Sequence, residues 1–385
     1  MKKYKIAILS GSRAEYGLLR PLLKKISLDS EIKLYLVLTG THLSPGHGQT
    51  EKEIKKDKIP IFDRIEMQLS SDTKNGMVKS TALGMIGLAD CFNRIIPDVL
   101  VCLGDRYEIF SGVYAAALMQ IPVAHIHGGE LTFGSIDESI RHSITKFSSI
   151  HFAATETYKK RIIQMGENPK YVFNTGAMAV ESILDIKIIN LLEIQKIIKN
   201  KIYNDYFLIT IHPPTSQKVN LKKFTQQILN ALSFFKKTTF IFTYANSDSG
   251  GYIINKMCED FCKLDPEKRI IKKSLGHELY INLMRKATLV IGNSSSGVIE
   301  APILNTPTVN IGNRQEGRYM PESVINTIPA EVNILSAINK ALKLKINNNL
   351  HPFGKGKTSY KIINELKKFI KSDKKIPKKF NDINY

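Results

Sequence analysis

Short apolar runs that alternate with longer, helix-length stretches are the feature that most restricts how this chain can fold. In the first half of the sequence, strand-like runs occupy residues 6–10, 34–39, 99–103, 123–126 and 151–153. They are apolar almost throughout, as is typical of strands that a parallel sheet buries on both faces. Helix-length segments between them complete a strand–helix alternation, which predicts a doubly wound α/β domain.

The same pattern starts again after a middle segment at residues 178–201. Its strand-like runs lie at residues 206–211, 239–243, 288–291 and 308–311. A length of 385 residues also suits two domains better than one. We therefore predict two Rossmann-like domains, at residues 1–178 and 179–357, followed by one more helix from about residue 358. Ligands of open α/β sheets bind beyond the carboxyl ends of the strands, so the strand-end loops of both halves are expected to face one cleft.

The formal net charge of +20 admits two interpretations. A basic protein can bind nucleic acid, a membrane surface or an anionic small molecule. Alternatively, the lysines are a compositional trait of a chain rich in Lys, Ile and Asn. The densest lysine run, at residues 367–379, has little aromatic interleaving, unlike a surface that binds single strands. We interpret it as a solvated helix face and tail, and we expect no nucleic acid partner.

Hydropathy and cysteine spacing predict a cytoplasmic protein. No apolar run approaches the ~20 residues that span a bilayer, and no apolar segment of signal-peptide type follows Lys2 and Lys3. The four cysteines do not have the spacing of a zinc ribbon. We therefore expect reduced thiols, no membrane insertion and no metal site.

Charged residues follow two strands of the first half at their carboxyl ends. Residues 10–17 read Ser-Gly-Ser-Arg-Ala-Glu-Tyr-Gly, a glycine turn that leads into a helix whose free N–H groups favour a phosphate. The spacing is neither that of the dinucleotide fingerprint nor that of the Walker motif, so an ordinary turn is an equal alternative. Asp105 and Arg106 follow the third strand, either as a structural ion pair or as a catalytic carboxylate beside a phosphate-binding guanidinium.

A cluster of titratable residues follows the fourth strand. Because side chains alternate along a strand, His125 and His127 are expected to share one face. Two histidines can begin a zinc site, but no third ligand is evident, and acid–base chemistry with Glu130 fits the residue types better. Asp137 and Arg141 lie four apart on a predicted helix, where an ion pair is the structural alternative to a catalytic role.

The second half carries anion-binding features in three loops. His212 ends a strand and precedes two prolines, which hold it in an extended region. The run Ser294–Ser296 leads into a predicted helix at residues 297–304, and its hydroxyls with the helix N–H groups would form an anion cradle. Glu300, about one turn into that helix, can take a ribose diol. Arg314 and Arg318 follow the next strand and can neutralise a diphosphate.

Six motifs, taken in order, resemble one family. GSRAEYG, LGDRYEIFS, HIHGGE, DESIRHSITK, IGNSSSGVIE and NIGNRQEGR are similar to segments of the hydrolysing UDP-N-acetylglucosamine 2-epimerases of bacterial sialic acid pathways. The similarity runs from the N-terminus to about Arg318. It implies a glycosyltransferase-B-like fold, in which two Rossmann-like domains face a deep cleft and a C-terminal helix at about 358–385 crosses back to the first domain. It also implies UDP held mainly by the second domain.

The resemblance assigns roles residue by residue. Asp105 and Asp137 match positions that the family uses as catalytic carboxylates. Some relatives carry a catalytic glutamate where this chain has His127, so that proton transfer falls either to His127 or to Glu130. Ser294, Ser295 and Glu300 match the loop that binds uridine diphosphate, and Arg13, His212 and Arg314 match positions that contact nucleotide or phosphate. Arg106 lies beside the matching catalytic aspartate and is a further candidate for binding UDP. No cofactor and no metal ion are implied.

The implied reaction begins with anti-elimination of UDP, which leaves 2-acetamidoglucal, and ends with hydration to N-acetylmannosamine. One alternative is the same reaction on UDP- or GDP-N,N'-diacetylbacillosamine for legionaminic acid synthesis, with the 4-substituent read by loops at residues 40–49 and 70–77. A non-hydrolysing epimerase, a glycosyltransferase of the same fold and a non-enzymatic basic binding protein also stay open. The partner expected in each enzymatic case is a small nucleotide sugar, and the family implies a dimer or tetramer.

Overall fold

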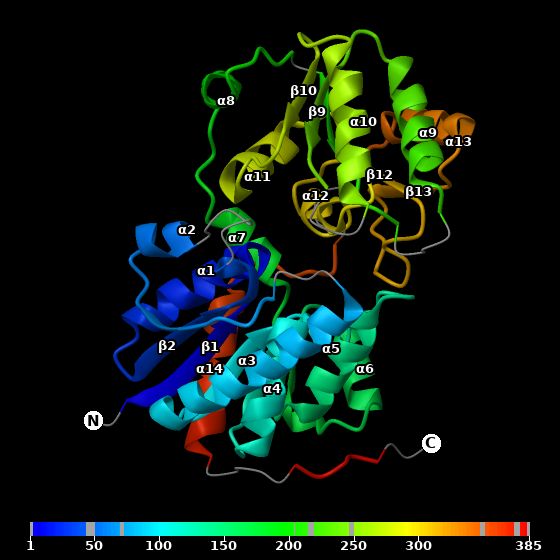
Figure 1. The fold of residues 1–385 in the computed structure, drawn as a ribbon. Coiled ribbons are helices and arrows are strands. Elements are labelled where there is room, and N and C mark those ends of the chain that lie inside the picture. Colours follow the sequence, from blue (N-terminus) through cyan, green and yellow to red (C-terminus); the bar gives the residue numbers. More distant parts are fainter. Residues whose placement is uncertain are drawn as a thin grey trace. The chain divides into compact units, whose positions relative to one another are not determined.

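The chain divides into two compact units, each described by itself below (Figure 1). Unit 1 comprises Met1–Glu130, Ile136–Asp185 and Pro352–Tyr385, and unit 2 comprises Leu131–Ser135 and Ile186–His351. The structure is a computed structural model that describes residues 3–43, 51–69, 73–203, 205–214, 219–245, 250–346, 351–372 and 378–382.

Unit 1 is built on a seven-stranded parallel sheet of order β3-β2-β1-β4-β5-β6-β7. Its strands are β1 (Tyr4–Ser10), β2 (Ile32–Thr39), β3 (Ile61–Ile65), β4 (Val99–Leu103), β5 (Val123–Ile126), β6 (Ile150–Ala153) and β7 (Val172–Asn174). The chain starts in the middle at β1, runs to one edge and then crosses to β4. The carboxyl ends of β1 and β4 therefore form the switch point where such sheets bind ligands.

Both faces of this sheet are buried, as its apolar strands predict. Ile6 and Ile8 of β1 belong to one apolar cluster, whereas Ala7 and Leu9 belong to another. Alternate side chains of a strand point to opposite faces, so each cluster is the core between the sheet and one layer of helices. The helices of unit 1 are α1 (Arg13–Leu28), α2 (Glu51–Lys56), α3 (Lys74–Ile95), α4 (Tyr107–Leu118), α5 (Ile136–Phe147), α6 (Glu156–Gln164), α7 (Met178–Leu184) and α14 (Thr358–Lys371).

The last helix, α14, is part of unit 1 although it is distant in sequence. Its buried residues Ile362, Leu366 and Phe369 recur on one face, and they join the same cluster as Ile6 and Ile8. The helix packs against α1 and α7. In Figure 1 it is the red helix labelled α14, next to the blue strands β1 and β2.

Unit 2 repeats the architecture with a six-stranded parallel sheet of order β10-β9-β8-β11-β12-β13. Its strands are β8 (Tyr206–Thr210), β9 (Thr239–Thr243), β10 (Arg269–Lys272), β11 (Leu289–Gly292), β12 (Thr308–Ile311) and β13 (Val324–Thr327). Its helices are α8 (Leu191–Ile198), α9 (Leu221–Ser233), α10 (Gly251–Lys263), α11 (His277–Lys286), α12 (Glu300–Ile303) and α13 (Glu331–Ala341). The switch point lies between β8 and β11.

The predicted fold class, two Rossmann-like α/β halves, is confirmed. Two details differ from the sequence prediction. The first unit continues to Asp185 rather than to residue 178, and Leu131–Ser135 groups with unit 2. The helix predicted at residues 297–304 was wrong: a 3₁₀ turn, η4 (Ser295–Gly297), precedes a four-residue α12 that contains Pro302. A proline lacks the N–H that a continuous helix needs beyond its first turn.

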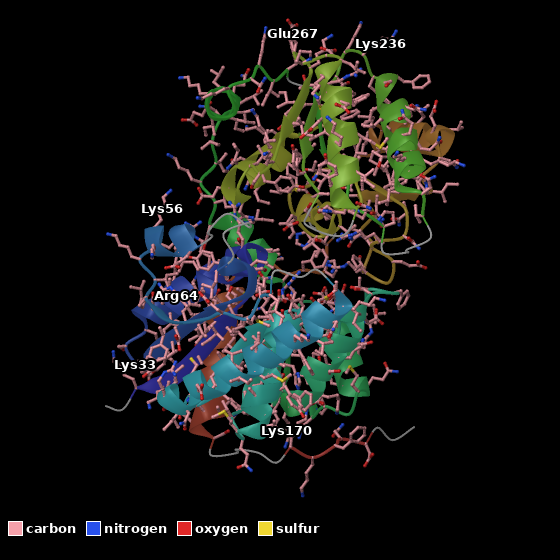
Figure 2. The ribbon with its side chains drawn as sticks, in the orientation of Figure 1. Lys33, Lys56, Arg64, Lys170, Lys236 and Glu267 are labelled. Atoms are coloured by element: carbon pink, nitrogen blue, oxygen red, sulfur yellow. The ribbon has the colours of Figure 1, made fainter. Side chains whose placement is uncertain are left out.

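The basic side chains are spread over the surface of both units. Figure 2 labels Lys33, Lys170 and Lys236, which are exposed and extend outward from the ribbon. Two of the C-terminal lysines, Lys367 and Lys378, are more anchored than a solvated tail would be. Nζ of Lys367 lies 2.7 Å from a carboxylate oxygen of Glu31. Lys378 donates to the carboxylate of Glu167 and to the backbone carbonyl of Ser148, the residue after α5. In the described part of the chain, no helix combines the length and apolarity needed to cross a bilayer.

Candidate active site

Two neighbouring loops of unit 1, which follow β4 and β5, carry the predicted acid–base residues Asp105 and Glu130. The Asp105 carboxylate accepts a hydrogen bond from Nη2 of Arg141 on α5. Nη1 of the same guanidinium donates to the backbone carbonyl of Glu130 at 2.9 Å. Burial lowers the pKa of Arg141, but the charges of Asp105, Glu130 and Asp137 raise it overall, so the side chain stays cationic. One buried cation thus ties the two loops together.

His127 lies beside Glu130 and orients it. Its Nε2 accepts the backbone N–H of Met178 at 3.1 Å, at the start of α7. A neutral imidazole has one acceptor and one donor nitrogen, so the proton lies on Nδ1, which is 3.2 Å from Oε1 of Glu130. Both side chains are buried. The arrangement lets His127 donate to the Glu130 carboxylate rather than act alone.

The prediction that His125 and His127 share a strand face was wrong. The strand β5 ends at Ile126, and His127 has a φ of +67°, a left-handed turn conformation that breaks the alternation. His125 is fully buried, and its Nε2 lies 2.8 Å from the carbonyl oxygen of Gly104. Burial lowers the pKa of His125 to about 3, so it is a neutral residue that fixes the turn before Asp105. In the described residues, no group of three or more His, Cys, Asp or Glu side chains is arranged to hold a metal ion.

Sequence reasoning missed two buried carboxyl residues near Arg106, Glu108 and Glu15, of which Glu108 holds its guanidinium. Its Nε and Nη2 donate to both oxygens of the fully buried Glu108 at 3.1 and 3.0 Å. Glu15 lies nearby and accepts the N–H of Gly11 at 2.7 Å. Burial raises the pKa of Glu15 to about 8, an effect that the charge of Glu108 increases, so Glu15 is protonated at neutral pH. A Cβ on Gly40 would lie 2.6 Å from the Gly11 carbonyl oxygen, which explains why a glycine closes this corner.

In unit 2, Asn293 joins the loops that carry His212 and Arg314. The backbone N–H of His212 donates to Oδ1 of Asn293 at 2.7 Å, and Nδ2 of Asn293 donates back to the His212 carbonyl at 2.8 Å. Arg314 donates to the carbonyl of Asn293 at 3.3 Å. Burial and the charge of Arg314 lower the pKa of His212 to about 3. A neutral donor and a permanent cation thus lie together, as binding of a phosphate group requires.

The serine loop after β11 is organised by its third serine. Oγ of Ser296 lies 2.9 Å from Oγ of Ser294 and 2.8 Å from the hydroxyl of Tyr280. A Cβ on Gly292 would overlap the carbonyl of Thr210, so β11 can approach β8 this closely only with glycine there. Because the long helix is absent, an anion at this loop would meet the hydroxyls of Ser294 and the neighbouring serine and the N–H groups of a short 3₁₀ turn.

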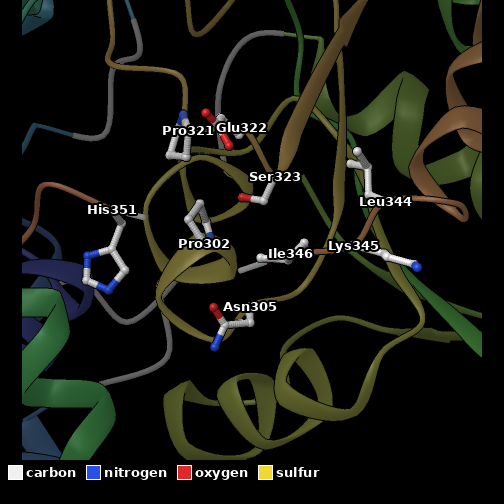
Figure 3. Close-up of a pocket in the computed structure, with 9 residues that line it drawn as sticks. All are labelled: Pro302, Asn305, Pro321, Glu322, Ser323, Leu344, Lys345, Ile346 and His351. Atoms are coloured by element: carbon white, nitrogen blue, oxygen red, sulfur yellow. The ribbon is translucent and has the colours of Figure 1, made fainter. Parts of the chain in front are cut away.

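A cavity of about 640 Å³ in unit 2 borders Asn293 and Arg314. Its volume lies within the roughly 300–1,000 Å³ typical of small-molecule sites. Asn293, Arg314 and Arg318 form a polar side of the lining, and Phe224 and Ile328 contribute apolar surface. A second cavity, shown in Figure 3, is far smaller, with about 80 Å³ between residues that include Pro302, Ser323 and His351. It is too small for a nucleotide.

Comparison with known proteins decides the family. The family profile described as UDP-N-acetylglucosamine 2-epimerase matches residues 24–367. The chain belongs to this family. A GDP/UDP-N,N'-diacetylbacillosamine 2-epimerase (hydrolyzing) of Campylobacter jejuni is 41% identical over 90% of this chain and 89% of the relative. The polysialic acid biosynthesis protein P7 of Escherichia coli is 38% identical over 98% of this chain and 97% of the relative.

Solved structures show the same fold. The UDP-GlcNAc 2-epimerase from Neisseria meningitidis, bound to UDP-GlcNAc, superimposes with a TM-score of 0.80 at 19% identity and covers 94% of this chain and 100% of that one. A putative UDP-N-acetylglucosamine 2-epimerase from Listeria monocytogenes also gives a TM-score of 0.80, with both chains fully covered at 17% identity. At these identities the likeness concerns the architecture alone.

In this 2-epimerase family member, the predicted site residues fall into one group in each unit. Unit 1 carries Arg13, Asp105, Arg106, His127, Glu130 and Asp137, and unit 2 carries His212, Ser294, Ser295, Glu300 and Arg314. Contacts bring Glu130 together with His127 and, through Arg141, with Asp105. Arg13 is half-buried as the first residue of α1, and its nucleotide contact stays a prediction.

Glu300 gives the unit 2 group a pH dependence. Burial raises the pKa of its carboxyl to about 7, against the lowering effects of its own backbone N–H and of Arg318. If Glu300 accepts the ribose hydroxyls, its ionised form binds best, and the dissociation constant of UDP should fall about fivefold to tenfold from pH 6 to pH 8. His212 stays neutral over this range and does not contribute.

Isothermal titration calorimetry of UDP against the wild type and Glu300→Gln at several pH values measures this effect. The β-phosphate of UDP also titrates near pH 6, but it does so equally in both proteins. The ratio of the two dissociation constants therefore isolates Glu300. A ratio that stays constant from pH 6 to pH 8 would show that this carboxyl does not bind the nucleotide.

Proposed function

We propose that this chain is a hydrolysing 2-epimerase that converts UDP-N-acetylglucosamine and water into UDP and N-acetylmannosamine, a precursor for sialic acid synthesis. The observation that carries the proposal is the pair of carboxyl residues, Asp105 and Glu130, that one buried arginine holds on adjacent loops. Family membership supports the nucleotide sugar, and relatives that are 38–41% identical include one named as hydrolysing.

The reaction needs one group that removes a proton and one that returns it. A carboxylate takes the C2 proton while the C1–O bond to UDP breaks, which leaves 2-acetamidoglucal. Water then adds at C1, and a carboxylic acid protonates C2 from the opposite face. Asp105 and Glu130 are proposed for these transfers, with Asp137 in the first turn of α5 as the third carboxyl of the group. His212 and Arg314 of unit 2 would stabilise the departing diphosphate.

A second substrate is favoured by a specific finding. The 41% identical Campylobacter jejuni relative and a 34% identical one from Legionella pneumophila are both named as hydrolysing 2-epimerases of N,N'-diacetylbacillosamine nucleotides. The same carboxyl pair would perform that reaction unchanged. The loops predicted to read the 4-substituent, 40–49 and 70–77, lie outside the described residues at 44–49 and 70–72.

Incubation of the purified protein with each nucleotide sugar in D2O, followed by proton NMR, tests the proposal. We expect UDP and C2-deuterated N-acetylmannosamine to appear together from UDP-N-acetylglucosamine. Consumption of only a diacetylbacillosamine nucleotide would keep the reaction and replace the substrate. A UDP sugar that is epimerised at C2 but still linked to UDP would indicate the non-hydrolysing reaction. If no UDP forms without an added acceptor, the result favours the transferase or the binding-protein alternative.

We also propose a cytoplasmic homo-oligomer, a dimer or a tetramer. All four cysteines are buried and free, as in a reducing compartment.

The helix α3 exposes Val78, Leu83 and Ile86, which are 68%, 43% and 64% exposed, and such a row of apolar residues is typical of a contact between subunits. Light scattering after gel filtration should give at least twice the chain mass of 43.4 kDa. The double variant Leu83→Glu with Ile86→Glu should have a lower mass by light scattering. A monomeric wild type would contradict the proposal.

A further inference from the structure

Arg141 is buried more completely than its charge would ordinarily allow. It is 1% exposed and is among the largest fully buried side chains of the protein. Removing a guanidinium from water is costly unless its donors are paired. Its Nη2 donates to the Asp105 carboxylate and its Nη1 to the Glu130 carbonyl. These partners belong to the two loops that carry the proposed proton-transfer groups.

The exposure of the ion pair is asymmetric. The side chain of Arg141 is 2% exposed, whereas that of Asp105 is 23% exposed. The carboxylate is therefore open to a ligand, and the guanidinium behind it is not. Arg141 cannot touch a substrate in this position, although its charge and its fixed fork geometry act directly on a group that can.

Glu130 is contacted by two different side chains, one at its main chain and one at its carboxylate. Arg141 holds its backbone carbonyl, while His127 contacts its side chain from the other direction. His127 is in turn fixed by the N–H of Met178. Glu130 is thus constrained at both its main chain and its carboxylate, and Arg141 contacts both Glu130 and Asp105.

We propose that Arg141 is a positioning residue for the reaction: it aims the Asp105 carboxylate and sets its distance from Glu130. This inference rests on the proposed function. It differs from a structural ion pair in that the effect of Arg141 on turnover passes through Asp105. An error of about 1 Å in the position of a reacting group can lower the rate by about 100-fold, so the role has a measurable size.

Arg141→Lys tests the fork geometry, because lysine keeps the charge but cannot donate to both partners from two fixed nitrogens. We expect kcat to fall roughly 10- to 100-fold, with KM and the affinity for UDP changed by less than about twofold. Arg161→Lys is the matched control. Arg161 donates to the neighbouring carbonyl of Gly129 but contacts no proposed proton-transfer group, so this variant should keep nearly wild-type kcat.

A double variant separates positioning from a general structural role. If Arg141 acts through Asp105, Arg141→Lys should add nothing to Asp105→Asn, because residues that act as a unit are not additive. A further loss in the double variant equal to the loss in the single one would overturn the proposal, as would full kcat in Arg141→Lys. If melting curves show that Arg141→Lys does not fold, the double variant Arg141→Gln with Asp105→Asn takes its place, because it buries no charge. Its kcat is compared with that of Asp105→Asn alone: an equal kcat supports the proposal, and a further loss overturns it.

The wild-type rate keeps this test distinct from that of the function. A wild type that releases no UDP from any of the nucleotide sugars contradicts the proposed function and this inference with it. An active wild type whose Arg141→Lys variant is equally active contradicts the inference alone.

Discussion

Asp105→Asn is expected to lower kcat for UDP release by about 10²- to 10⁴-fold, the range for loss of a group that transfers a proton. Asparagine has nearly the same shape and keeps an oxygen that can accept from Arg141, but it can neither take nor carry the proton. The residues of unit 2 that are proposed to hold UDP are untouched, so the dissociation constant of UDP should stay within about twofold. A loss confined to kcat identifies an interaction made only during the reaction.

Stability has to be measured beside activity for this variant. Removing one partner of a buried ion pair leaves the other charge uncompensated, which costs about 3–5 kcal/mol at worst. Assays should therefore run well below the melting temperature of the variant. Asp90→Asn on the exposed side of α3 is the matched control and should be fully active. An Asp105→Asn protein that folds and retains more than a tenth of wild-type kcat would remove Asp105 from the proton-transfer group.

The interior of the fold was predictable because strands that are buried on both faces are continuous apolar runs in the sequence. The central strands β1, β4 and β8 are continuous apolar runs, and each was found with almost correct bounds. Edge strands lack that mark. β3 reads Ile-Phe-Asp-Arg-Ile, with charged residues inside it, and β10 begins and ends with a basic residue. Only the pairing of β3 and β10 with β2 and β9 defines them as strands.

The positions of the site residues were predictable for a related reason, since strand ends in parallel sheets converge on one edge. Their partners were not. Nothing in the spacing of Arg141 indicates that it reaches Asp105 on another loop. Glu15 and Glu108 each sit in the first turn of a helix, where a glutamate is ordinarily an exposed helix-terminus charge. Only the tertiary structure shows that both are buried.

Local backbone conformation accounts for the error at His127. A period of two applies only while the chain stays extended, and the left-handed turn at this residue ends the strand one position early. The turn has a functional consequence. It rotates the imidazole away from the register of His125 and toward both Met178 and Glu130. The sequence left the proton carrier undecided between His127 and Glu130, and this geometry favours the carboxyl.

Glu130→Gln and His127→Asn should therefore differ in the size of their effects. Glutamine cannot transfer a proton, so Glu130→Gln is expected to lower kcat by about 10²- to 10⁴-fold. His127 only orients Glu130, so its loss should cost about tenfold. Asparagine is the appropriate replacement because it tolerates the left-handed conformation that His127 adopts. Glu156→Gln, an exposed position at the start of α6, is the control and should match the wild type.

Deuterium incorporation adds a second measurement to this comparison. In D2O, a variant that still removes the C2 proton but cannot complete the reaction exchanges that position in unreacted substrate, whereas a variant without its base does not. His127→Asn should keep C2 deuteration in step with UDP release, because its base is intact but misaligned. If instead His127→Asn is the more impaired of the two and Glu130→Gln turns over normally, the imidazole carries the proton, and the roles of the two residues at the 3.2 Å contact between Nδ1 and Oε1 are reversed.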